Sequence, residues 1–143
     1  MATTKTDDAA AIRARVDAAD WAKVSTDLDA QGWAIVPKLL THAEAGAIAG
    51  LYHQEQGFRS QVIMARHGFG RGEYKYFSYP LPPVIQALRI AAYPRLVPVA
   101  NQWHERMRNG VRFPHDHAAF LERCHQAGQV RPTPLLLEYA PED

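Results

Sequence analysis

The first third of the chain has a pattern of apolar and polar positions that predicts helices separated by short breaks. Residues 8–18 are rich in alanine, the strongest helix former, and they follow residues 1–7, which we expect to be a frayed tail. Asp20 is a typical N-cap residue, so we expect a second helix from there to Gln31, with Gly32 as its C-terminal stop. The chain is therefore expected to begin with a helical layer.

A short strand and a third helix are expected next. Residues 33–36 are apolar and partly β-branched, which predicts a strand that ends at Pro37. Thr41 and Glu44 have the spacing of a capping box, in which each side chain bonds the backbone N–H of the other residue. This spacing predicts a helix from Thr41 to about His53.

The middle of the chain predicts a pair of strands, over residues 61–65 and 73–79. Between them lies a glycine-rich segment, residues 67–72. Its glycines fit neither the dinucleotide-binding pattern G-x-G-x-x-G nor a Walker A sequence, which ends in Gly-Lys-Ser/Thr. We interpret it as a loop between two strands, of a kind that can close over a substrate.

The last third predicts three helical stretches and a final strand, over residues 80–92, 96–107, 116–126 and 134–139. Pro94 and Pro98 are expected to interrupt the helical stretch or to lie in a first helical turn. The final strand is so apolar that both of its faces need cover, and a strand also needs a partner. We therefore expect the chain to be the front part of a larger protein.

Helices that precede sparse strands predict an α+β fold, and 143 residues suffice for about one domain with a core. The formal net charge of +1 favours no partner, but its distribution is uneven. Lys and Arg outnumber Asp and Glu by 9 to 2 in residues 59–112, whereas acidic residues prevail on either side. A basic middle between acidic ends suggests an anionic ligand, although a solvated face with chance clustering is an equal alternative.

The expected strand at residues 73–79 combines aromatic and basic side chains. Alternation places Glu73, Lys75, Phe77 and Tyr79 on one face and Tyr74, Tyr76 and Ser78 on the other. Stacking on bases and holding phosphates would need such a combination, and the candidate substrate-binding residues are Arg66, Arg71, Tyr74, Lys75 and Tyr76. The alternative is a structural strand packed on both sides.

Other polar residues have simpler interpretations. The sequence His115-Asp116-His117 suggests a metal site, but imidazoles two residues apart do not converge, so Asp116 is expected to be a helix cap. Asn101 is expected to anchor a neighbouring loop. Cys124, the only cysteine, is expected to be a partly buried helical thiol.

The sequence gives no sign of export or of a membrane span. Its first residues lack an apolar signal core, and no run approaches the roughly 18 apolar residues that a membrane helix needs. We expect a cytoplasmic protein without a membrane partner; its oligomeric state is open.

Three segments together resemble a known family. They are Gly32–Pro37 with Leu40–Glu44, Glu73–Phe77 with Tyr79–Pro82, and Gly128–Tyr139. The combination is similar to a bacterial family of predicted 2-oxoglutarate/Fe(II) oxygenases, described as acting oxidatively on damaged, alkylated DNA. In addition, Leu137-Glu-Tyr-Ala-Pro141 resembles the Asn-Arg-Tyr-Ala-Pro strand of AlkB-type demethylases.

The resemblance implies a fold, a cofactor set and one site residue. It covers residues 20–143 and implies there a helical layer with the first strands of a truncated double-stranded β-helix, or jelly roll; residues 1–19 precede it as a tail and helix. It also implies that Tyr139 donates a hydrogen bond to 2-oxoglutarate. Leu137 stands where the AlkB-type strand has Asn, so one cosubstrate contact is missing or supplied elsewhere.

The resemblance further implies Fe(II) held by a His-x-Asp…His triad that would begin beyond the final strand. We therefore expect Fe(II) and 2-oxoglutarate in the full-length parent, and neither cofactor, nor activity, in this chain alone. The implied partner is alkylated DNA or another nucleic acid, whose damaged base would be oxidised after extrusion from the stack. Two alternatives stay open, which are a hydroxylase of the same fold acting on an amino acid or protein side chain, and a non-enzymatic binding module.

Overall fold

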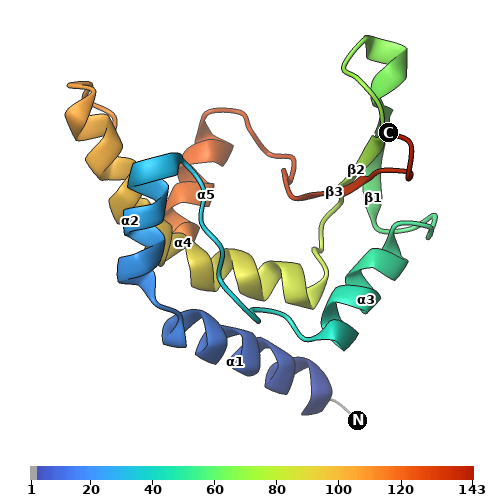
Figure 1. Ribbon diagram of the computed structural model, residues 1–143, viewed down its shortest axis with the longest axis horizontal. Coiled ribbons are helices and arrows are strands. Elements are labelled where there is room, and N and C mark those ends of the chain that lie inside the picture. Colours follow the sequence, from blue (N-terminus) through green and yellow to red (C-terminus); the bar gives the residue numbers. More distant parts are fainter. Residues whose placement is uncertain (1–2) are drawn as a thin grey trace.

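A computed structural model describes residues 3–143 of the chain. Its elements are, in order, α1 (Thr3–Ala18), α2 (Trp21–Gln31), α3 (His42–Leu51), β1 (Phe58–Ile63), the 3₁₀ turn η1 (Met64–His67), β2 (Glu73–Phe77), α4 (Pro83–Arg106), α5 (His117–Gln126) and β3 (Leu135–Glu138). Helices form one layer, and a small sheet stands at its end above α3 (Figure 1). The predicted α+β class is confirmed, while the wider jelly roll and the division at residue 20 stay predictions.

The helical layer is centred on α1 and α4, which pack side by side. Each helix buries aliphatic side chains, Ile12 and Val16 from α1 and Val97 and Val99 from α4. Removing one such side chain from water stabilises the fold by about 1.5–3 kcal/mol. No helix of the described residues is long and apolar enough to cross a membrane.

The predicted helix caps are confirmed. The Asp20 side chain accepts a hydrogen bond from the Lys23 N–H, and Gly32 ends α2 in the left-handed conformation at φ 80°. Thr41 and Glu44 form the expected capping box at the start of α3, and Asp116 caps α5. These interactions are local, which is why the sequence predicts them.

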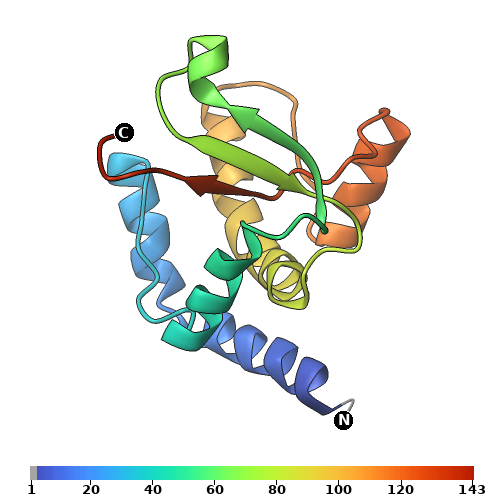
Figure 2. The same ribbon diagram turned by 90° about the vertical axis from the view of Figure 1, so that its right-hand side faces the viewer.

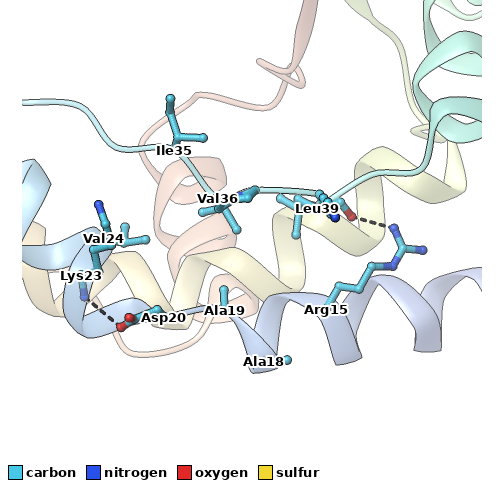
Figure 3. Close-up of a pocket in the computed structure, with 11 residues that line it drawn as sticks. Arg15, Ala18, Ala19, Asp20, Lys23, Val24, Ile35, Val36 and Leu39 are labelled. Carbon is cyan, nitrogen blue, oxygen red and sulfur yellow. Dashed lines mark hydrogen bonds between the residues drawn. The ribbon is translucent and has the colours of Figure 1, made fainter.

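The expected strand at residues 33–36 is wrong, because this segment has no partner strand among residues 3–143 and crosses α1 as irregular chain. Ile35 and Val36 lie over the C-terminal turn of α1, and the Arg15 guanidinium donates to the Leu39 carbonyl at 2.6 Å (Figure 3). Trp33 and Ile35 are largely exposed. An apolar, β-branched run is a strand only where another strand meets it.

The expected break in the fourth helix is also wrong. Pro94 and Pro98 lie inside α4, which continues through both and changes direction along its length (Figure 1). An interior proline costs about 3 kcal/mol and bends a helix. The buried Val97 and Val99 offset that cost by their packing in the helical layer.

Element ends differ by a few residues from those expected. The expected frayed tail is helical from Thr3 onwards, whereas residues 1 and 2 lie outside the described residues. Propagating an existing helix costs little, so the alanine-rich run extends towards the N-terminus. β1 lies earlier than expected, since Phe58 already pairs with Phe77 and the chain turns into η1 at Met64.

The sheet is antiparallel, with β2 between β1 and β3. Tyr74 lies opposite Val62 of β1 and Leu137 of β3, and Tyr76 lies opposite Ser60 and Leu135. A bulge in β1 falls at Arg59. The expected final strand is thus confirmed and is paired along one edge.

Candidate functional site

The sheet has two faces of different character. Residues directly opposite each other in an antiparallel sheet share a face. We call one of them the tyrosine face, and it consists of Ser60, Val62, Tyr74, Tyr76, Leu135 and Leu137. The other face carries Glu73, Lys75 and Phe77 and is turned towards the end of α3. The alternation expected for residues 73–77 is confirmed, whereas Tyr79 lies beyond the strand.

The face towards α3 is occupied by Tyr52. Its hydroxyl donates to the Glu73 carboxylate at 2.8 Å, and the Lys75 amine donates to the Tyr52 carbonyl at 2.5 Å. The same amine lies 4.5 Å from the centroid of the Tyr52 ring. Burial, and then the bond to Glu73, raise the pKa of the Tyr52 hydroxyl well above its usual range. Lys75 therefore holds the sheet to α3 and lies apart from the other proposed substrate-binding residues.

Tyr74 and Tyr76 come together on the tyrosine face. Their ring centroids are 5.5 Å apart in an edge-to-face arrangement. The Arg59 guanidinium lies 4.3 Å from the Tyr76 ring centroid, and its Nε donates to the Pro132 carbonyl at 3.0 Å. The cation–π contact and the hydrogen bond together fix this guanidinium over the Tyr76 ring.

Tyr139 follows β3 and lies against the neighbouring strand. A side chain at Gly72 would place its Cβ 2.6 Å from Cδ1 and Cε1 of Tyr139 and 2.9 Å from Cε of Met64. Gly72 thus gives the ring space that any other residue would fill. With 60% of its surface exposed, Tyr139 remains accessible to a ligand.

Arg66 and Arg71 lie in the connection between β1 and β2, and both are exposed. Arg71 donates a hydrogen bond to the Glu142 carbonyl, which joins this connection to the segment after β3. Arg66 lies in η1, directly after β1. The structure therefore gathers Tyr74 and Tyr76, leaves the two arginines along the connection, and separates Lys75 from both.

Sequence reasoning did not assign Gly72 to this site, and it counted Arg59 with Arg66, Arg71 and Lys75 as basic residues that a nucleic-acid substrate would need on one surface. Arg59 reaches the tyrosine face from a bulge, which no local pattern in β1 announces. Gly72 directly precedes β2 at φ +90°, and a glycine beside a strand was an available signal of close approach.

Comparison with known proteins identifies the family to which this chain belongs. Residues 72–143, half of the chain, match the family described as "Oxygenase, catalysing oxidative methylation of damaged DNA". This chain belongs to that oxygenase family. The matched segment begins at Gly72 and includes β2, α4, α5 and β3.

Two curated relatives match about half of the chain. The uncharacterized proteins MT2286 and Rv2227, from the CDC 1551 / Oshkosh and ATCC 25618 / H37Rv strains of Mycobacterium tuberculosis, are each 39% identical to this oxygenase chain over 67 residues. That stretch is 47% of this chain and 29% of each relative, so the chain matches less than a third of their length. No solved structure matches the chain.

An iron site of the kind that the resemblance implies does not fit the described residues. Within residues 3–143, no three His, Cys, Asp or Glu side chains lie close enough together to hold a metal ion. His117 packs edge-on against the Tyr93 ring at 5.5 Å, and its neighbour Asp116 caps α5.

Two further sequence predictions concern α4 and α5. The Asn101 side-chain amide donates to the Phe113 carbonyl at 3.1 Å and accepts from the Phe113 N–H at 2.7 Å, so its predicted anchoring role is confirmed. Cys124 is half-buried in α5, as expected.

Two cavities lie away from the tyrosine face. One of about 240 Å³ lies between α1 and residues 35–39, where Arg15 and Asp20 already bond the backbone (Figure 3). The other, of about 430 Å³, is lined by Phe58, Phe77 and the prolines before α4. Because Phe58 and Phe77 also stack at 5.0 Å beside Tyr52, this second cavity belongs to the face towards α3.

Proposed function

We propose that this chain is the N-terminal part of a 2-oxoglutarate- and Fe(II)-dependent oxygenase that dealkylates damaged nucleic acid. The observation that carries the proposal is the coincidence of the family match with the site. The match begins at Gly72 and extends past Tyr139, so it contains both partners of the contact beside the tyrosine face.

Tyr139 is the proposed cosubstrate residue. It lies at the end of β3 with an exposed side chain, and its ring rests on Gly72. A phenol held in this way can donate one hydrogen bond to a carboxylate or keto oxygen of 2-oxoglutarate. The backing at Gly72 limits how far the ring can move.

The tyrosine face is the proposed surface for nucleic acid. Aromatic rings stack on unpaired bases whatever their sequence, and guanidinium groups bind phosphate. Tyr74 and Tyr76 supply the rings, and Arg59 is a cation fixed 4.3 Å from one of them. The exposed Arg66 and Arg71 extend the positive charge along the connection between β1 and β2.

The iron ligands are proposed to come from a further part of the protein, because the described residues do not assemble them. Bound iron with 2-oxoglutarate would supply the oxidising power for an alkyl C–H bond. The greater length of the curated relatives is consistent with such a further part. This chain would then position cosubstrate and base.

The experiment is an oxidation assay of the full-length protein on an oligonucleotide with one methylated base. We expect loss of the methyl group, release of formaldehyde and consumption of 2-oxoglutarate, all dependent on added Fe(II). Mass spectrometry of the oligonucleotide measures the loss of the methyl group directly. An unchanged oligonucleotide, with 2-oxoglutarate consumed only when an amino acid or a protein is supplied, would contradict the nucleic-acid substrate.

Tyr139→Phe in the full-length protein tests the cosubstrate role. It removes one hydrogen bond worth about 0.5–1.5 kcal/mol, so the dissociation constant for 2-oxoglutarate should rise by about two- to tenfold. Calorimetry measures it, and Tyr79→Phe, which changes a tyrosine outside the sheet, is the matched control. Equal affinities of wild type and Tyr139→Phe would remove Tyr139 from the site.

A further inference from the structure

The connection between β1 and β2 presents an aromatic ring to solvent. We call residues 64–72 the hairpin tip; it projects beyond the strands, away from α1 and α3 (Figure 1 and Figure 2). Phe69 lies in this tip with 65% of its surface exposed. Its ring stacks on that of His67, with centroids 5.4 Å apart and planes within 21°.

The hairpin tip has a defined backbone. The Met64 N–H donates to the Gly72 carbonyl at 3.1 Å, and the Phe69 N–H donates to the Met64 carbonyl at 3.0 Å. Gly68 and Gly70, on either side of Phe69, adopt left-handed conformations at φ 71° and 105°. Glycine has these conformations at little cost, so the tip can fold back on both sides of one outward ring.

The base of the tip is fixed to the rest of the sheet. Met64 is buried, and its side chain lies beside Gly72 and Tyr139. The bond from Arg71 to the Glu142 carbonyl adds a second connection to the segment after β3. The position of Phe69 is therefore set relative to the proposed cosubstrate residue.

The charge of the tip indicates the kind of partner. Residues 64–72 contain Arg66 and Arg71 but no Asp or Glu, and both arginines are exposed. Exposed apolar rings flanked by cations fit a surface that offers stacked planes between rows of negative charge. Duplex nucleic acid has this arrangement, because base pairs lie between two phosphate backbones.

We propose that Phe69, backed by His67, is a wedge that enters the base stack of duplex DNA while Arg66 and Arg71 bind the flanking phosphates. Apolar side chains that insert between base steps unstack them and kink the duplex. The ring would fill the space left by a base that is extruded towards the tyrosine face, which lowers the cost of extrusion. This inference rests on the proposed function and adds to it the duplex as the preferred substrate form.

The test compares duplex with single-stranded binding in the full-length protein. Both probes carry the same methylated base, and the duplex has 2-aminopurine beside it, whose fluorescence rises when it is unstacked. Base–aromatic stacking is worth enough that Phe69→Ala should lower the ratio of duplex to single-strand affinity by at least about fivefold. It should also abolish the fluorescence rise, while Phe69→Trp should retain both. Val130→Ala, which shortens an exposed residue in the loop before β3, is the control and should behave as wild type.

The possible outcomes separate this inference from the proposed function. Unchanged ratio and fluorescence in Phe69→Ala would overturn the wedge, while dealkylation of the single strand by wild type would leave the proposed function in place. Equal losses of affinity for the duplex and the single strand in Phe69→Ala would also overturn the wedge. A wild type that binds neither probe would overturn both proposals, and Phe69-dependent binding to phosphatidylserine vesicles in its place would assign the tip to a membrane surface.

Discussion

Gly72 is the residue at which backbone conformation and side-chain packing impose the same requirement. Its φ of +90° lies in a region that residues with a side chain rarely adopt. An added Cβ would also approach the Tyr139 ring to 2.6 Å, well inside van der Waals contact. One missing side chain therefore allows both the turn into β2 and the seating of Tyr139.

Gly72→Ala should destabilise the protein more than Gly70→Ala. Both substitutions strain a left-handed residue by about 1–3 kcal/mol, but only position 72 adds a steric clash, since nothing lies within 4 Å of a Cβ at Gly70. We expect a further loss of at least about 1 kcal/mol for Gly72→Ala, measured by urea denaturation. Equal losses of stability in Gly72→Ala and Gly70→Ala would show that the Tyr139 ring moves aside at little energetic cost.

At the scale of elements, one carboxylate joins α1 to α3. Glu44 accepts from the Thr41 N–H at 2.8 Å within the capping box and from the Arg15 guanidinium of α1 at 2.6 Å. The Arg15 bond, and then the Thr41 N–H, lower the pKa of the Glu44 carboxyl to about 2. The helix cap and the tertiary contact thus depend on one ionised group.

The stability of the fold should fall in acid because of Glu44. Its folded pKa of about 2 lies below the ordinary value of 4.5, so its contribution is complete above pH 4.5 and is lost as the pH falls towards 2. Glu44→Gln should lower the free energy of unfolding at pH 7 and flatten its decrease between those values. Urea denaturation at a series of pH values measures this, with Glu55→Gln as the control. An unchanged slope in Glu44→Gln would contradict the assignment.

The elements show which parts of the fold a sequence predicts. Caps such as those at Asp20 and Thr41 depend on residues three positions away, and all were predicted. The segment at residues 33–36 and the interior Pro94 depend on what packs against them, so propensity alone gave wrong answers. Interactions between residues close in sequence can be predicted from the sequence, whereas contacts between distant segments depend on the folded structure.

In the candidate site too, the features that depend on local pattern were predicted and those that depend on distant contacts were not. Period-two alternation placed Tyr74 and Tyr76 on one face, since alternation needs only the strand itself. It also placed Lys75 on the opposite face, but not its bond to the Tyr52 carbonyl 23 residues away. The contact of Arg59 with Tyr76 depends on a bulge and on strand register, which no short pattern specifies.

At the scale of the whole molecule, the chain exposes an unusually large surface. Its accessible area is 10047 Å², whereas a compact protein of 16.0 kDa exposes about 7,400 Å². Part of the excess is apolar and lies along β3, at the edge of the sheet, where Leu137 is 55% exposed. A surface of this kind is what the proposed larger oxygenase would cover.

Leu137→Lys tests that cover in the full-length protein. If a further part of the protein packs along β3 and leaves Tyr74 and Tyr76 of β2 open to nucleic acid, Leu137→Lys replaces a buried leucine by a charge, and the free energy of unfolding should fall by at least about 1.5–3 kcal/mol. Gln129→Lys, which adds the same charge in the loop before β3, should change it by less than about 0.5 kcal/mol. Thermal and urea denaturation measure both. An unchanged free energy of unfolding in Leu137→Lys would mean that β3 stays exposed in the full-length protein.

The seating of Tyr139 on Gly72 has a thermodynamic consequence for the order of events. If the proposed function holds, 2-oxoglutarate bound to this phenol would also fix the base of the hairpin tip in the position that DNA binding needs. The affinities for cosubstrate and DNA are then coupled, and coupling is reciprocal: any factor by which cosubstrate strengthens the grip on DNA is the factor by which DNA strengthens the grip on cosubstrate. Such a protein would retain its cosubstrate best when damaged DNA is in place.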